Sequence, residues 1–376
     1  MLFPRTTFSL MDDISLRTPR DVGTWLAGHG LCASGAVAGV SPMSVRGTAV
    51  MATLRDGGTI FLKRCGVGAP GARPRGEAAL LTLVQTQPAL EPYRRVSPAL
   101  LHYDGKDGVI ATRGIVAHET LRARCGGLPP TNEELIAVIA RRLAACHDAS
   151  RALPSAARSD AVLRGEPPVP NYDHVTPTEL AHAAGTDIRT YLAAVQGVAA
   201  ALRQMREGWR TDCLIHGDLK DDNILVGSAT GEADLSIVFV DWELSSWGDP
   251  RWDLGTLIGQ FLFYWVDSIP LGAGGDFGAW IASAKVPFDQ VRHTTEYLVK
   301  TYIAASRDPS VRSLDWLAMV VRYAGVFLLH RALVTMEYMG VLTPATYSCL
   351  HLGRTLISNT SVQRVLLPSL ARVGTC

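Results

Sequence analysis

The sequence predicts an α+β protein with a small β-rich N-terminal lobe and a larger α-rich C-terminal lobe. Between residues 37 and 64, short apolar stretches alternate with turn signals, which is typical of a β-meander. Beyond residue 254, the pattern predicts helices almost to the end of the chain. The 376 residues, 47% of them hydrophobic, suffice for two lobes with a sizeable core. We assign residues 1–113 to the N-terminal lobe and 114–376 to the C-terminal lobe.

The elements of the N-terminal lobe follow from turn and helix-start signals. Proline favours the first helical turn, so Thr18-Pro19 begins a helix. A glycine-rich turn separates two strands at residues 56–58. In order, we expect a helix from Thr18 to Gly28 or Gly30, a strand ending near Ser44, a turn over Val45–Thr48, strands Ala49–Leu54 and Thr59–Lys63, and a helix over Gly76–Val84.

The C-terminal lobe is predicted from capping boxes and helical spacing. Residues 109–116 predict the strand that leads from one lobe to the other. Thr131 with Glu134, and Thr176 with Glu179, are capping boxes that each begin a helix. We expect these helices to end at His147 and Gly185, and further helices over Asp187–Glu207 and near residues 254–267, 288–306, 314–339 and 343–357.

The stretch over residues 211–254 carries the polar residues on which the functional prediction depends. A His-Gly-Asp motif ends at Asp218, and Asn223 follows five residues later. A β-branched apolar run then leads to Asp241, which we place at the end of a strand. Two short strands around Asp218 and Asn223, with a third ending at Asp241, would bring three oxygen ligands together.

Three oxygen ligands in this arrangement suit phosphoryl transfer from a nucleotide. That reaction needs positioning and charge neutralisation more than covalent chemistry. A carboxylate must hold the acceptor hydroxyl and accept its proton, and Mg²⁺ prefers oxygen ligands. Any single Asp here is explained equally well as a turn or cap residue. The combination of Asp218, Asn223 and Asp241 favours the catalytic interpretation.

The arrangement resembles the aminoglycoside phosphotransferase/choline-kinase-like family, which shares its fold with protein kinases. The matching residues are His216-Gly217-Asp218, Asn223, Asp241 and Asp253. Asp218-Leu219-Lys220 with Asn223 also has the D-L-K-x-x-N spacing of the protein-kinase catalytic loop. The sequence departs from protein kinases at Trp242-Glu243, where those proteins have Phe-Gly.

The resemblance implies a bilobal protein-kinase-like fold that binds ATP and Mg²⁺ between its lobes. It implies Asp218 as the catalytic base, with Asn223 and Asp241 as ligands of Mg²⁺. Asp253 is expected to be structural and to accept hydrogen bonds from amides of the catalytic loop. His216 is expected to be a hydrogen-bonding scaffold residue.

Lys63, at the end of the third strand, resembles the kinase lysine that holds the α- and β-phosphates. The alternative is a solvated lysine at a strand end. The kinase lysine needs an acidic partner on the next helix, where Glu77 is the single acidic residue, so we predict a Lys63–Glu77 pair. The alternative for Glu77 is a position that the helix dipole favours near the N-terminus.

Further nucleotide contacts are assigned by their place in the resemblance. The turn holding Ser44 and Thr48 would cover the phosphates, although it has one glycine and is not a G-x-G-x-x-G loop. Backbone groups from Thr112 to Gly114 are expected to meet the adenine. Lys220 is expected to neutralise charge on the transferring γ-phosphoryl group, or else to be a solvated loop lysine.

The composition excludes several partners and compartments. The net charge of +1 gives no field that attracts nucleic acid or a membrane. Seven scattered cysteines without C-x-x-C spacing predict reduced thiols, which indicates a cytoplasmic protein. The N-terminus lacks the basic-then-apolar order of a signal peptide. The apolar stretches at 254–266 and 316–329 are interpreted as buried helices.

The sequence therefore predicts an ATP-dependent phosphotransferase that acts on a hydroxyl of a small molecule or peptide. One alternative is a Ser/Thr kinase that tailors a ribosomally made precursor peptide ahead of a lyase, with a possible partner protein. Another is a non-catalytic kinase-fold module that binds a nucleotide or a partner.

The C-terminal helical region is expected to supply most of the acceptor site, and its net charge predicts which substrates are excluded. Residues 255–376 hold seven acidic and ten basic residues, a net charge of +3. A polycationic acceptor is repelled by such a lobe, since like-sign fields slow association. We therefore expect that the acceptor is not a polycationic aminoglycoside.

Overall fold

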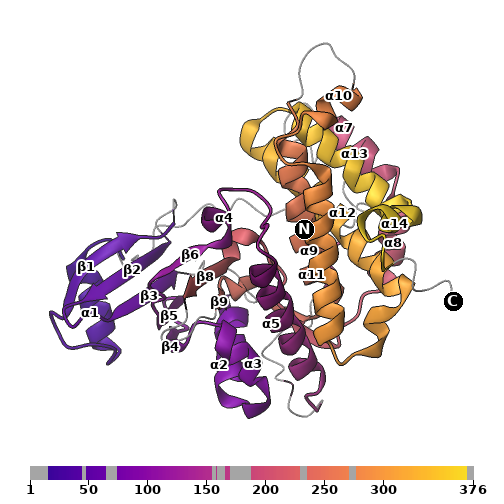
Figure 1. The fold of residues 1–376 in the computed structure, drawn as a ribbon. Coiled ribbons are helices and arrows are strands. Elements are labelled where there is room, and N and C mark those ends of the chain that lie inside the picture. The colour runs from indigo at the N-terminus through magenta and orange to yellow at the C-terminus, as the bar shows by residue number, and fades with distance from the viewer. Residues whose placement is uncertain are drawn as a thin grey trace.

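The computed structural model describes residues 16–44, 48–64, 74–154, 158, 166–169, 188–228, 235–270 and 277–370. It confirms an α+β fold with an antiparallel sheet in the N-terminal lobe and a larger helical C-terminal lobe. Figure 1 shows the sheet at one end of the molecule and the long C-terminal helices at the other.

The N-terminal lobe is built on one five-stranded antiparallel sheet within the described residues, in the order β1-β2-β3-β5-β4. The turn between β2 and β3 is closed by Asp56, whose Oδ1 accepts the amide of Gly58 at 2.9 Å. The bounds are α1 (Pro19–Gly28), β1 (Val37–Pro42), β2 (Ala49–Leu54), β3 (Thr59–Arg64), α2 (Pro74–Thr86), η1 (Pro88–Leu90), α3 (Glu91–Val96), β4 (Leu100–Asp104) and β5 (Val109–Arg113).

One face of this sheet forms a core with α1. Ile60 and Leu62 of β3 are buried in it together with Leu26 of α1. Because side chains alternate along a strand, Lys63 points to the opposite face. On that face the ammonium group of Lys63 reaches residues of the C-terminal lobe.

The C-terminal lobe contains short strands, which carry the predicted catalytic residues, and a set of helices. Its strands and 3₁₀ helices are β6 (His118–Thr120), β7 (Cys213–Ile215), η3 (Asp221–Asn223), β8 (Ile224–Ser228), β9 (Leu235–Phe239), η4 (Trp242–Leu244), β10 (Ser246–Gly248), η5 (Pro309–Arg312) and η6 (Thr360–Val362). Its helices are α4 (Leu121–Arg124), α5 (Glu133–Arg151), α7 (Ile188–Gln196), α8 (Ala199–Glu207), α9 (Pro250–Asp267), α10 (Phe277–Ala282), α11 (Phe288–Ala305), α12 (Leu314–Met339), α13 (Pro344–Ser358) and α14 (Gln363–Leu366).

Helix α12 is the centre of the helical packing and lies between α9 and α13. A Cβ on Gly325 of α12 would come within 2.7 Å of the carbonyl oxygen of Gly353 in α13, so glycine allows this close approach. Among the described helices, α12 alone has the length and apolar composition of a membrane span, over Leu314–Met336. Its contacts with α9 and α13 are those of a core helix.

Several boundaries differ from the sequence prediction. The cap of α5 is Asn132, whose Oδ1 accepts the amide of Leu135 at 3.0 Å, so the predicted capping box at Thr131 is wrong. The helix predicted over Asp187–Glu207 is two helices, because the chain turns between α7 and α8 at Gly197. Strand β4 and helix α3 were not predicted. The helix predicted from Thr176 to Gly185 lies outside the described residues.

Candidate active site

The loop between β7 and β8 carries Asp218, Lys220 and Asn223. The side chains of Lys220 and Asn223 converge on the carboxylate of Asp218. Lys220 Nζ lies 2.5 Å from Asp218 Oδ2, and Asn223 Nδ2 lies 3.1 Å from the same oxygen. Asn223 Nδ2 also donates to the backbone oxygen of Asp218 at 2.8 Å. Asp218 is therefore held by a cation and an amide donor, and its side chain is 28% exposed, which leaves it accessible to an acceptor.

Asp253 anchors the start of this loop, as the sequence predicted. It is fully buried in the first turn of α9 and accepts the amides of His216 (2.8 Å) and Gly217 (3.0 Å). His147 of α5 lies 3.2 Å from the same carboxylate. Each oxygen of this buried acid thus has a donor, which a buried charge requires.

His216 is a neutral scaffold residue, in agreement with the prediction. Its Nε2 donates to the carbonyl oxygen of Val240 at 2.9 Å, and its Nδ1 accepts the amide of Asp218 at 3.3 Å. Burial lowers the pKa of His216, although Asp253 acts in the opposite direction. The neutral ring therefore joins the loop to the end of β9.

The glycine of the His-Gly-Asp motif is required by the backbone. Gly217 has φ +81°, and a Cβ there would lie 2.3 Å from the carbonyl oxygen of Leu244. Both the left-handed conformation and the contact exclude a larger residue.

Lys63 is surrounded by three carboxylates. It forms the predicted pair with Glu77 of α2, with 3.2 Å between Nζ and Oε2. It is also in direct contact with Asp241 and lies 3.0 Å from Oε2 of Glu243. One ammonium group thus joins β3 and α2 of the N-terminal lobe to the segment after β9.

The carboxylates around Lys63 outnumber the positive charge. Burial opposes the charge of Lys63, but Glu77, Asp241 and Glu243 outweigh it and raise its pKa. Burial raises the pKa of Glu77, and Asp241 adds to this while Lys63 opposes it. The excess negative charge is a suitable environment for a cation.

Asp241 and Asn223 fit a divalent cation in both donor chemistry and placement. The amide of Val240, the residue before Asp241, donates to the backbone oxygen of Asn223 at 3.0 Å, so the two residues lie side by side. Because Asn223 uses its amide nitrogen on Asp218, its side-chain oxygen is left to act as a ligand. Asp241 has φ +66°, a left-handed conformation that is uncommon outside glycine. No group of three His, Cys, Asp or Glu side chains that could hold a metal occurs among the described residues.

Two contacts of the segment after Asp241 were not predicted from the sequence. Glu243 contacts Lys63, and the amide of Trp242 donates to Oε1 of Glu77 at 3.3 Å. Glu77 therefore holds Lys63 with one oxygen and the backbone after Asp241 with the other. The sequence around Glu243 has no local pattern that distinguishes this acid from a solvated one.

The other residues predicted to contact the nucleotide are hydrogen-bonded or buried within the N-terminal sheet and its turns. Ser44 Oγ accepts the amides of Thr48 (2.9 Å) and Ala49 (3.1 Å), which closes the turn between β1 and β2. The amide of Gly114 donates to the carbonyl oxygen of Thr59 at 2.9 Å. Thr112 is buried in β5. That amide of Gly114 is thus not free for an adenine, and residues 45–47 of the turn lie outside the described residues.

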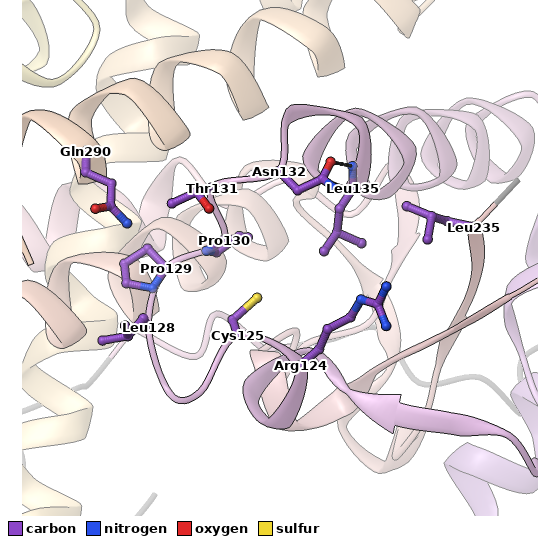
Figure 2. A pocket seen from close by; sticks show the side chains of 10 residues that line it. All are labelled: Arg124, Cys125, Leu128, Pro129, Pro130, Thr131, Asn132, Leu135, Leu235 and Gln290. Carbon is purple, nitrogen blue, oxygen red and sulfur yellow. Dashed lines mark hydrogen bonds between the residues drawn. The ribbon is translucent and has the colours of Figure 1, made fainter.

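A separate cavity of about 330 Å³ lies beside α4 and the first turn of α5 (Figure 2). None of the residues predicted to bind nucleotide or metal lines it. Burial raises the pKa of the half-buried Cys125 in its wall, so this thiol is not an activated nucleophile. The cavity is therefore distinct from the catalytic groups. Its lining residues are Arg124, Cys125, Leu128, Pro129, Pro130, Thr131, Asn132, Leu135, Leu235 and Gln290.

Solved structures with a similar fold include an ethanolamine kinase and a choline kinase. Ethanolamine kinase from Plasmodium vivax aligns with a TM-score of 0.52 at 10% identity, covering 92% of this chain and 89% of that one. Choline kinase LicA from Streptococcus pneumoniae aligns with a TM-score of 0.52 at 14% identity, covering 89% of this chain and 98% of that one. LicA in complex with AMP aligns with a TM-score of 0.51 at 14% identity, over 90% of this chain and 97% of that one. At these identities the likeness shows the fold.

Membership of a family rests on a separate match. No curated protein matches this chain. A model of the phosphotransferase enzyme family matches residues 40–284, which is more than half of the chain and includes Lys63 and the whole catalytic loop. The match supports a phosphotransferase, and it favours neither a peptide-tailoring kinase nor a non-catalytic module. The chain belongs to the phosphotransferase enzyme family and has its protein-kinase-like fold.

Proposed function

We propose that the protein transfers the γ-phosphoryl group of ATP to a hydroxyl group of a small molecule, with Mg²⁺ as the cofactor. The observation that carries this proposal is the carboxylate of Asp218, which is held by Lys220 and Asn223 on a loop anchored by Asp253. A carboxylate fixed in this way is suited to orient a hydroxyl, since phosphoryl transfer depends on positioning.

The proposed step moves one proton and one phosphoryl group. Asp218 accepts the proton of the acceptor hydroxyl while the acceptor oxygen forms a bond to the γ-phosphorus. The bond from that phosphorus to the β–γ bridging oxygen breaks, and ADP leaves with the bonding pair. Lys63 holds the α- and β-phosphates, and Lys220 neutralises charge on the transferring group.

Asn223 and Asp241 are the residues that would hold Mg²⁺. When bound, the cation neutralises charge on the phosphate oxygens. The surplus of carboxylates around Lys63 supports this assignment, because those charges need a further cation. On nucleotide binding, Lys63 exchanges its contact with Asp241 for contacts with phosphate.

The acceptor in this proposal is a small molecule that is not a polycation. The net charge of +3 over residues 255–376 disfavours a polycation. Ethanolamine and choline kinases share the fold, so a single amine on the acceptor is compatible with it. An aminoglycoside with several ammonium groups is not expected to be turned over.

A coupled assay of ADP release tests the proposal. The purified protein is given Mg-ATP with a panel of sugars, nucleosides, choline, ethanolamine, Ser/Thr peptides and aminoglycosides, and Asp218→Asn is run beside it. We expect turnover of a small hydroxyl compound that this variant loses. Efficient turnover of an aminoglycoside at micromolar concentration would overturn the acceptor assignment. Failure to bind Mg-ATP in calorimetry would overturn the function itself.

A further inference from the structure

Helix α9 donates a series of hydrogen bonds to the catalytic loop. Successive donors along the helix reach successive residues of the loop. Trp252 donates its Nε1–H to the carbonyl oxygen of Gly217 at 2.8 Å. One turn later, Thr256 donates its hydroxyl to the carbonyl oxygen of Leu219 at 3.1 Å. Residues four apart lie on one face of a helix, so this row of α9 faces the loop. Two turns further along the same row is Tyr264.

Tyr264 donates its hydroxyl directly to the carboxylate of Asp221. The two side chains are buried, with 2% of Asp221 and 6% of Tyr264 exposed. Oδ1 of Asp221 has no hydrogen-bond partner in the part of the chain that the structure describes. Burial raises the pKa of Tyr264, and the neighbouring Asp221 adds to this, so the hydroxyl keeps the proton that it donates.

The buried carboxylate of Asp221 lowers the stability of the fold. A buried polar atom without a partner destabilises a fold, and an apolar residue beside α9 would remove that cost. Burial of an acid here therefore does not follow from stability. The Tyr264–Asp221 hydrogen bond instead fixes the position of Asp221 in the loop.

Asp221 stands between the two residues that hold the carboxylate of Asp218. It begins the 3₁₀ turn η3, in which the amide of Asn223 donates to the carbonyl oxygen of Lys220 at 2.9 Å. The side chains of Lys220 and Asn223 converge on the same oxygen of Asp218. A rotation of this turn would move both of them away from it.

We propose that the Tyr264–Asp221 hydrogen bond is a positioning contact, which fixes η3 so that Lys220 and Asn223 hold Asp218 in its catalytic orientation. The inference rests on the proposed role of Asp218 as the base. Asp221 and Tyr264 act through their neighbours and need not touch the substrate.

Kinetics of four variants test the positioning role. Tyr264→Phe keeps the ring and removes the hydroxyl, Asp221→Asn keeps an oxygen that accepts from Tyr264, and Asp221→Ala removes it. Tyr347→Phe, on the exposed surface of α13, is the matched control. We expect Tyr264→Phe to lower kcat at least about tenfold, the effect of losing one hydrogen bond to a charged group. The Kd for Mg-ATP should change by a smaller factor than kcat does, because Lys63 and Asp241 stay in place and only Asn223 of the cation site belongs to η3.

The pattern across variants separates positioning from simple stability. Asp221→Asn should retain more kcat than Asp221→Ala, and the double variant of Tyr264→Phe with Asp221→Ala should be no slower than Asp221→Ala alone. A wild-type kcat in Tyr264→Phe would overturn the proposal. The proposal would also be overturned if each loss of kcat equalled the loss of folded protein that calorimetry measures.

A measurement that needs no turnover keeps this inference separate from the proposed function. Hydrogen exchange of the free protein reports the Asn223 amide, which closes η3. Tyr264→Phe should speed exchange there while α12 is unchanged, and Tyr347→Phe should leave both unchanged. Unchanged exchange at Asn223 in Tyr264→Phe would overturn the positioning role, whether or not an acceptor has been found.

Discussion

The ammonium group of Lys63 is in direct contact with the carboxylate of Asp241, 178 residues further along the chain. The contact joins β3 of the N-terminal lobe to the residue that we propose as a ligand of Mg²⁺. Glu77 and Glu243 contact the same ammonium group. The nucleotide phosphates and the cation would enter between charges that already pair with each other.

Lys63→Ala is expected to raise the KM for ATP and to lower kcat. The substitution removes the cation that holds the phosphates and leaves Glu77, Asp241 and Glu243 without a counter-charge, so repulsion of the nucleotide adds to the loss. We expect kcat/KM to fall on the order of 10²-fold. Lys106→Ala, in the exposed turn between β4 and β5, is the control. Wild-type kinetics in Lys63→Ala would mean that the phosphates are held elsewhere.

Asp218→Asn is expected to fold and to bind Mg-ATP while losing transfer. The amide cannot accept the hydroxyl proton, and loss of a general base costs about 10²–10⁴-fold in kcat. Asp222→Asn changes an exposed acid of the same loop and should retain kcat within about tenfold. ADP release and calorimetry measure the two quantities. Near-full turnover by Asp218→Asn would remove this residue as the base.

Asp241→Ala is expected to weaken the binding of Mg-ATP more than Asp218→Asn does. Asp241 is the proposed direct ligand, whereas Asp218 is held by Lys220 and Asn223 and faces the acceptor. Calorimetric titration with Mg-ATP compares the Kd values, and titration with ATP in the presence of a chelator isolates the metal-dependent part. Equal Kd values for the two variants would exclude Asp241 from the metal site.

His330 is expected to make the fold less stable in acid. Burial beside Trp252 lowers its pKa from 6.5 to about 4. Below pH 6.5 the unfolded chain therefore binds a proton that the folded protein does not, and the free energy of unfolding falls as the pH falls towards 4. At pH 5 this difference amounts to up to about 2 kcal/mol.

The variant His330→Gln tests this pH dependence. Glutamine stays neutral, so the difference in Tm between pH 7 and pH 5 should be smaller than in the wild type. It should not vanish, because burial also lowers the pKa of His216. An identical change in Tm in both proteins would show that His330 protonates equally well in the folded state.

The sequence by itself determined the architecture and the main catalytic loop. Turn residues, apolar strands and the spacing of Asp218, Asn223 and Asp241 are local features, and local chemistry places each of them. The Lys63–Glu77 pair was also predictable, because β3 and the helix that follows it are adjacent in the chain and Glu77 is the single acid in the predicted helix. The cap of α5 was missed since Thr131 and Asn132 are both good caps, and only the backbone decides between them.

Only the tertiary structure decided what the acidic residues around the site contact. Glu243 reaches Lys63, and Asp221 is buried under Tyr264, because α2 and α9 bring distant segments against the loop. No local pattern distinguishes these acids from solvated ones, since burial and charge partners depend on contacts that are far apart in the sequence. Sequence spacing determines which groups are near each other along the chain, whereas their protonation and orientation follow from packing across it.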